Sequence, residues 1–173
     1  GSDVIFIAVG TPPLPNGDAN LSYLEAAARS IGASMDASRF RVVVNKSTVP
    51  VGCGNLVETL VREGIADARP GQLRSIRFGV ASNPEFLREG CALGDSLYPD
   101  RIVVGTSDPE TMGVMRELYA PVISQAFDAP PGLPRPAGMR QAPLLATTLT
   151  SAEMIKYAAN AFLAMKIGFA NEM

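Results

Sequence analysis

Residues 3–10 read DVIFIAVG, and residues 11–17, which follow them directly, read TPPLPNG. The first run is apolar at almost every position and rich in β-branched residues, which is typical of a strand that helices cover on both faces. The second run is a cluster of Thr, Pro, Asn and Gly, which interrupts regular structure. A buried strand that ends in such a loop is the repeating unit of an α/β fold, in which ligands bind beyond the carboxyl ends of the strands.

The rest of the chain repeats this unit. We predict further strands at 41–46, 76–81, 102–105 and 144–149, and helices at 22–35, 52–63, 107–119 and 150–173. Capping-box patterns that begin at Ser22, Ser107 and Thr150 indicate three of the helix starts. The Pro- and Gly-rich segment 128–143 is expected to be an exposed loop. This alternation predicts a doubly wound, mostly parallel, Rossmann-like sheet followed by a long C-terminal helix.

Composition excludes several classes of protein. The chain has 173 residues, 47% of them apolar, and a net charge of -2, so it can form a globular core but has no basic field that would attract nucleic acid. No apolar run approaches the ~20 residues of a membrane span. With two cysteines and no leader pattern, we expect a cytoplasmic protein. Because histidine is absent, a Ser-His-Asp triad or a His-rich metal site within this chain is excluded, and we expect no metal.

Three loops are expected to meet at the carboxyl ends of the strands, namely 10–17, 46–52 and 83–90. The segment Gly52-Cys53-Gly54 superficially matches a dinucleotide-binding fingerprint, but it begins too far beyond its strand and Val57 stands where a small residue is required. We expect instead a helix N-terminus near Gly52 that offers a secondary site for a phosphate or ribose.

Two pairs of residues stand out as candidate chemistry. Glu85 and Glu89 lie four residues apart just beyond a buried strand, whereas Lys156 and Asn160 share one face of the last helix. Alternatively, Glu85 and Glu89 are carboxylates in an ordinary exposed loop. Lys156 and Asn160 equally fit a solvated face of the last helix, which carries a separate apolar stripe.

Five segments, in this order and at this spacing, carry a resemblance to a known family. They are FIAVGTP (6–12), KSTVPVG (46–52), NPEFLREG (83–90), PDRIVVG (99–105) and AEMIKYAANAFLA (152–164). Together they resemble the UDP-glucose/GDP-mannose dehydrogenase family, which oxidises the C6 hydroxyl of a nucleotide sugar to a carboxylate with NAD, through an enzyme thioester. The resemblance covers nearly the whole chain except 128–143.

The resemblance implies a role for each matching residue. The implied contacts to NAD are Val9, Gly10, Thr11, Pro12, Ser47, Thr48, Val49 and Glu89. The implied contacts to the UDP-sugar are Glu85, Phe86, Leu87, Arg88, Glu89, Lys156 and Asn160. Glu85 would be the general base for thioester hydrolysis through water, Lys156 and Asn160 would hold the reacting oxygen, and Thr48 would also serve catalysis. A carboxylate is a competent base for that water if partial burial modestly raises its pKa.

Two departures from the family pattern limit what this chain is expected to do alone. No G-x-G-Y-V-G segment precedes Asp3, and the family's catalytic-cysteine motif is absent, since Cys53 and Cys91 are expected to serve packing. We therefore expect part of a larger homo-oligomeric enzyme, with a partial NAD-binding domain at 1–149 and the start of a central dimerisation helix at 150–173. The motifs favour UDP-glucose over GDP-mannose or UDP-N-acetylmannosamine, and the alternative is a non-catalytic binding or dimerisation remnant.

Overall fold

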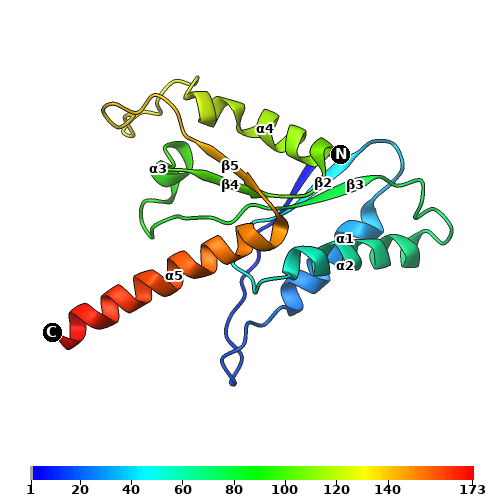
Figure 1. Ribbon diagram of the computed structural model, residues 1–173. Helices are drawn as coiled ribbons and strands as arrows, with labels where there is room; N and C mark the ends of the chain where they lie inside the picture. Colours follow the sequence, from blue (N-terminus) through cyan, green and yellow to red (C-terminus); the bar gives the residue numbers. More distant parts are fainter. Residues whose placement is uncertain (1) are drawn as a thin grey trace.

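The chain folds into one five-stranded sheet with helices on both faces, and Figure 1 shows residues 2–173, which a computed structural model describes. The strands are β1 (Val4–Ile7), β2 (Arg41–Asn45), β3 (Phe78–Ser82), β4 (Ile102–Gly105) and β5 (Leu144–Thr147). The helices are α1 (Ser22–Ser34), α2 (Cys53–Ala68), α3 (Ala92–Leu97), α4 (Pro109–Ser124) and α5 (Leu149–Glu172). Gly1, which the predicted first domain includes, lies outside the described residues.

The strand order is β1-β2-β3-β4-β5, and one change of direction divides the sheet. The first three strands are parallel, β4 is antiparallel to β3 through the pair Ser82 and Gly105, and β5 is parallel to β4. Right-handed crossovers place α1 and α2 on one face of the first three strands. The same handedness places α4 on the opposite face, because β4 and β5 run the other way (Figure 1). The predicted doubly wound, mostly parallel sheet is confirmed.

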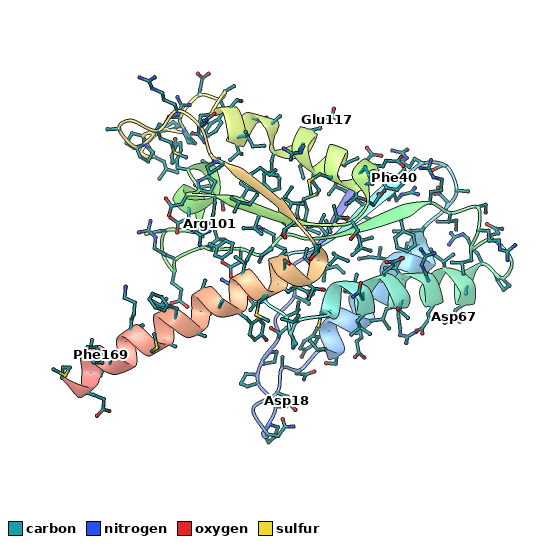
Figure 2. The ribbon with its side chains drawn as sticks, in the orientation of Figure 1. Asp18, Phe40, Asp67, Arg101, Glu117 and Phe169 are labelled. Carbon is teal, nitrogen blue, oxygen red and sulfur yellow. The ribbon has the colours of Figure 1, made fainter. Side chains whose placement is uncertain are left out.

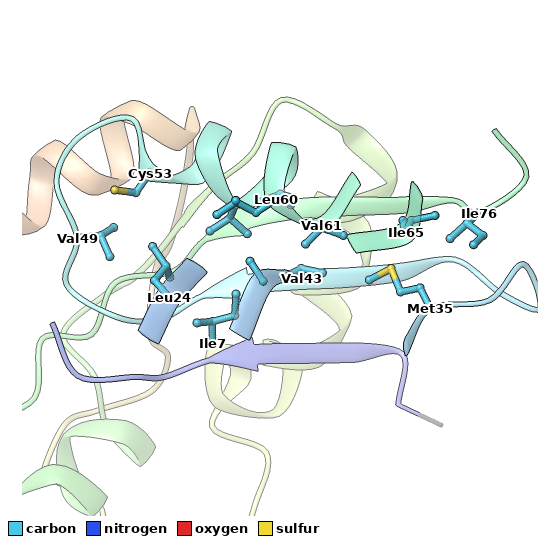
Figure 3. Close-up of a cluster of buried hydrophobic side chains, with 13 residues drawn as sticks. Ile7, Leu24, Met35, Val43, Val49, Cys53, Leu60, Val61, Ile65 and Ile76 are labelled. Atoms are coloured by element: carbon cyan, nitrogen blue, oxygen red, sulfur yellow. The ribbon is translucent and has the colours of Figure 1, made fainter. Parts of the chain in front are cut away.

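The core on the α1 and α2 face is closely packed, and Figure 3 shows Ile7 of β1 and Val43 of β2 beneath side chains of both helices. The two helices approach each other backbone to backbone. A Cβ atom added at Gly32 of α1 would collide with the Val61 carbonyl, and one at Gly64 of α2 would collide with the Arg29 carbonyl. Glycine is therefore required at this crossing by space alone.

The helix starts differ from the predicted capping boxes by one or two residues. Leu21 precedes α1 without a side-chain cap, and the Asn20 carboxamide oxygen accepts a hydrogen bond from the Ser22 N–H instead. Asp108 caps α4 by accepting from two backbone N–H groups, and the Thr148 hydroxyl caps α5 by accepting from Ser151. The boxes located three helices correctly but named the wrong capping residues, because a short motif does not specify which residue leaves the helical conformation.

Helix α5 begins against the sheet and then extends away from it, as Figure 1 shows. Every residue from 160 to 173 is exposed, and Figure 2 shows Phe169 near the far end of the helix. The predicted apolar stripe is therefore only partly covered: Ile155 and Ala159 are half-buried, whereas Phe162 and Leu163 are 58% and 56% exposed.

The helix ends also differ from prediction. Both α2 and α4 run five residues past their predicted ends, and α4 includes Pro121 before it stops at Gln125, whose φ of 55° is left-handed. Segment 128–143 contains no regular helix or strand, as predicted, and is mostly exposed. Of the helices in residues 2–173, none combines the length and apolar character that a membrane-spanning helix requires.

Candidate functional site

The three predicted loops do meet at the carboxyl ends of β1, β2 and β3. The Thr11 hydroxyl donates to the Thr48 carbonyl oxygen at 2.8 Å, which joins the first loop to the second. The Lys46 ammonium donates to the Asn83 carboxamide oxygen at 3.2 Å, which joins the second loop to the third. The outer part of the first loop does not contribute, because Figure 2 shows Asp18 at a tip that projects away from the sheet.

An ion pair joins the two predicted constellations. Lys156 Nζ of α5 lies 3.1 Å from Glu85 Oε1 in the loop after β3, and the side chains are 9% and 31% exposed. The Lys156 ammonium also lies 5.3 Å from the centre of the Phe86 ring, whose π face attracts a cation. The Leu87 N–H donates to Glu85 Oε2 at 2.6 Å and fixes the carboxylate. Folding thus brings together a carboxylate and an ammonium 71 residues apart in sequence.

The pKa of Glu85 lies below its usual range, so the modest rise that would strengthen this carboxylate as a base is not found. Burial does raise the pKa of this carboxyl. The Leu87 N–H and the positive charges of Lys156 and Lys46 together outweigh burial, because each stabilises the ionised form. Glu85 is therefore ionised at neutral pH, and as a base it is weaker than an unperturbed glutamate.

Lys46 is a member of the site that the sequence reasoning missed. The pKa of Lys46 is lowered to about 8, chiefly by burial; the charge of Glu85 opposes this shift and the charge of Lys156 adds to it. Its partner Asn83 is buried, donates to the Val103 carbonyl oxygen and accepts from the Tyr119 hydroxyl. The sequence signal that could have identified Lys46 is its position directly after the buried strand β2, where ligand sites of α/β sheets lie.

A cleft of about 480 Å³ opens on the α3 and α4 side of the loop after β3. Residues that line it include Lys46, Glu85, Arg101 and Tyr119. The Arg101 guanidinium lies 4.7 Å from the Phe86 ring centre, so this ring has one cation from β4's start and another from α5. Titratable groups of both charges therefore border a space large enough for part of a small ligand.

The N-terminus of α2 is already occupied by a side chain of the protein. Both oxygens of the buried Glu153 carboxylate accept backbone N–H groups at 2.6 Å, one from Gly52 and one from Gly54. The predicted secondary site for a phosphate or ribose was therefore wrong, since its donors serve Glu153. The sequence signal for Glu153 was misinterpreted as part of a capping box, and its partners are about 100 residues away.

Other predicted site residues lie further from the ion pair or serve the fold. Glu89 and Asn160 are exposed, and among the hydrogen bonds and ion pairs of residues 2–173 none involves either side chain. The Arg88 guanidinium pairs with Asp95 of α3 at 2.7 Å. The Ser47 hydroxyl accepts from the Val9 N–H and donates to the Val9 carbonyl oxygen, both at 2.8 Å, so it links two loops.

The two cysteines differ. Cys53, the first residue of α2, is buried in the core. Burial, followed by the charge of Glu153, raises the pKa of its thiol to about 11, so it is an unreactive packing residue as predicted. Cys91 is exposed before α3, so the prediction that it serves packing was wrong. Within residues 2–173, no three Cys, Asp or Glu side chains gather closely enough to hold a metal ion.

Comparison with known proteins connects this geometry to a family. Residues 1–123 match the NAD binding domain of the UDP-glucose/GDP-mannose dehydrogenase family, and residues 150–173 match its central domain. The chain belongs to the UDP-glucose/GDP-mannose dehydrogenase family. Its cofactor is therefore NAD.

Relatives in this family cover nearly the whole chain. It is 49% identical over 177 residues to the UDP-glucose 6-dehydrogenase of Rhizobium meliloti and 44% identical over 172 residues to one from Bacillus subtilis. These alignments cover 99% of this chain but 34% and 32% of the two relatives. The chain thus spans about a third of the length of these curated relatives.

Solved structures give the same result. A UDP-glucose dehydrogenase from Pyrobaculum islandicum has a TM-score of 0.77 and 44% identity to this chain, with 99% of this chain and 34% of that chain covered. A GDP-mannose dehydrogenase from Pseudomonas aeruginosa has a TM-score of 0.75 and 37% identity, with the same coverage.

The loops predicted to contact NAD fit a cofactor of this kind in part. Gly10 is exposed, and a Cβ added there would meet no atom within 4 Å, so the space beside this residue is open. In residues 2–173 no hydrogen bond involves the Thr48 hydroxyl, whose residue lines a small void beside Lys156. The donors at the start of α2, in contrast, are blocked by Glu153.

Proposed function

We propose that the full-length protein oxidises the C6 hydroxyl of UDP-glucose to a carboxylate with NAD. The observation that carries the proposal is the Glu85–Lys156 pair at the carboxyl edge of the sheet, in a chain of this family. The identity of 44–49% to UDP-glucose 6-dehydrogenases supports this choice of substrate. Oxidation of an alcohol to a carboxylate removes four electrons, and bound NAD accepts two of them as a hydride, so each sugar requires two NAD molecules.

Lys156 stabilises the negative charge that develops on the reacting oxygen. Its side chain is 9% exposed and is held by Glu85 on one side and by the Phe86 ring on the other, so the ammonium has a fixed place before substrate arrives. A preorganised donor of this kind acts mainly in the transition state. Asn160, one turn further along α5, adds a neutral donor toward the same oxygen.

Glu85 accepts a proton from the water that hydrolyses the thioester. Its lowered pKa keeps it ionised at neutral pH, and the Leu87 N–H orients its second oxygen. The thioester cysteine is supplied by a part of the enzyme other than Cys53 and Cys91, because Cys53 is buried and neither lies in the family's motif. Thr11 and Thr48 contact the cofactor from the first two loops.

The choice between nucleotide sugars is tested separately from the chemistry. GDP-mannose is the alternative that a solved relative at 37% identity supports. A panel of UDP-glucose, GDP-mannose and UDP-N-acetylmannosamine, assayed with the full-length enzyme, should give the highest kcat/KM for UDP-glucose. A higher kcat/KM for either other sugar would reassign the substrate and leave the proposed reaction class intact.

The role of Glu85 is tested by Glu85→Gln in the full-length enzyme. The amide cannot take a proton from water, so the thioester should accumulate and steady-state turnover should fall by on the order of 10²–10⁴-fold. Intact-protein mass spectrometry under turnover measures the adduct. Glu58→Gln is the control, because Glu58 pairs with Arg62 on the outside of α2. Finding the variant only as free enzyme, with UDP-glucuronate still forming at the wild-type rate, would exclude the role.

A further inference from the structure

Glu153 joins the helix that carries Lys156 to the helix that follows the second loop. Glu153 is 4% exposed, and its carboxylate accepts hydrogen bonds from the Gly52 and Gly54 N–H groups at 2.6 Å. The Ser82 hydroxyl lies 3.3 Å from the oxygen that Gly54 contacts. Hydrogen bonds to an ionised acceptor are stronger than neutral ones, and the positive end of the α2 dipole adds to them. The contact is therefore a strong one between α5 and α2.

The start of α2 is built to receive this carboxylate. Gly52 provides no side-chain cap, and its φ of 103° favours glycine. At Gly54, an added Cβ would lie 3.2 Å from Glu153 Oε1 and 3.0 Å from a Leu149 methyl carbon. The two glycines thus leave room for a cap that comes from α5, about 100 residues further along the chain.

Helix α5 is held to the rest of the chain near its beginning. Ala152, Glu153 and Lys156 are its buried residues, whereas all of 160–173 is exposed. Ala152 packs on Gly105 of β4, where an added Cβ would collide with it. Apolar packing of Leu149 and Ala152 has no directional preference, whereas the two hydrogen bonds that Glu153 accepts are directional and constrain both the rotation and the sliding of the helix.

We propose that Glu153 is a positioning residue for Lys156: by binding the N-terminus of α2 it sets the rotation and depth of α5, and so places the Lys156 ammonium against Glu85. This role rests on the proposed function. Lys156 lies three residues after Glu153, on the same side of the helix, so a shift of one moves the other. The loop that carries Ser47 and Thr48 leads directly into α2, so the same contact aligns the cofactor side of the site with the catalytic helix.

The test uses Glu153→Ala and Glu153→Gln in the full-length enzyme, with Glu58→Gln as control. The first measurement needs neither substrate nor cofactor: brief acetylation with acetic anhydride, followed by mass spectrometry, gives the rate of modification at Lys46, Lys156 and Lys166. We expect Glu153→Ala to raise the Lys156 rate several-fold relative to Lys166, which lies ten residues further along α5. Formate, which can refill the carboxylate position, should restore protection. If the alanine variant fails to fold, the ratio of the Lys156 rate to the Lys166 rate is measured on the glutamine variant instead. Glutamine retains the side-chain volume but loses the charge and one acceptor.

The second measurement is steady-state kinetics. Misplacement of Lys156 by about 1 Å should lower kcat by on the order of 10²-fold and change KM less, and formate should recover kcat. An unchanged acetylation rate at Lys156, or equal increases in rate at all three lysines, would overturn the proposal. It would also be overturned if formate restored thermal stability but left kcat low. Should wild-type enzyme oxidise no nucleotide sugar, the proposed function fails, and the acetylation ratio still decides whether Glu153 positions Lys156.

Discussion

Lys46 is a partly buried ammonium whose proton is bound less tightly than in water. Its pKa is about 8 in the folded protein, against a usual value near 10.5 that applies when the chain is unfolded. Below pH 8 the ammonium is charged in both states, so the full unfavourable contribution of its burial is present. Between about 8 and 10.5 the unfolded chain binds more protons than the folded chain, so this contribution decreases and stability rises with pH.

Lys46→Met should therefore raise the free energy of unfolding at pH 7 by about 1–2 kcal/mol, while reducing turnover. Asn83 would keep a partner, because the Tyr119 hydroxyl also donates to its oxygen. The gain should shrink as pH rises from 8 to 10.5. Denaturant unfolding at both ends of that range measures it, with Lys166→Met on the exposed part of α5 as control. A variant that is less stable at pH 7, or a gain independent of pH, would refute this account of Lys46.

The residues of the site were only partly predictable. Glu85 and Lys156 could be selected because each falls at a position that the strand and helix pattern defines. Their ion pair could not, because it depends on where α5 crosses the sheet. Lys46 and Glu153 were missed for the same reason: burial and distant backbone partners determine their roles, and neither is visible in local spacing.

At the scale of elements, the α1–α2 contact depends on two glycines rather than on large side chains. Gly64→Ala should lower the free energy of unfolding by about 1–3 kcal/mol, because the added methyl meets the backbone of α1 and rigid carbonyl groups cannot move aside easily. The control is Gly113→Ala in α4, where the new methyl meets no atom within 4 Å. That change should stabilise the chain by about 0.5–1 kcal/mol. Thermal or denaturant unfolding of both variants checks the prediction, and shifts of the same sign would contradict it.

The sequence predicted the strands better than the helices, because the short helix α3 was not predicted and several helix ends were misplaced. Apolar runs identified all five strands: β2, β3 and β4 are buried almost throughout, and the edge strands β1 and β5 are apolar although partly exposed. The predicted capping residues were wrong at three helices. The residues that accept the first backbone N–H groups are Asn20, Asp108 and Thr148, and the turn before each helix determines them. Glu153 completed a capping-box pattern but instead caps a different helix.

At the scale of the whole molecule, apolar side chains are exposed on β1 and along the second half of α5. Strand β1 lies at the edge of the sheet with Phe6 41% exposed, and the second half of α5 exposes Phe162 and Leu163. An unpaired apolar edge strand favours pairing with another chain. The proposal of a homodimer or larger homo-oligomer, and the division of the chain at residue 149, both stay predictions.

Self-association of this chain is expected to depend on that edge. Static light scattering should show an average mass that increases with concentration. Phe6→Lys should reduce the increase, because a charge on an edge strand opposes pairing, whereas Leu118→Lys on the exposed side of α4 should not. A monomer at every concentration for the unmodified chain would exclude association through β1.

The most direct test of the account counts NADH formed per UDP-glucose consumed by the full-length enzyme. We predict two NADH per sugar, because the alcohol is taken to the carboxylate. Lys156→Ala, which removes the ammonium beside Glu85, should lower the rate by on the order of 10²–10³-fold. One NADH per sugar, or a wild-type rate in the Lys156→Ala enzyme, would contradict the assignment of this site to a nucleotide-sugar 6-dehydrogenase.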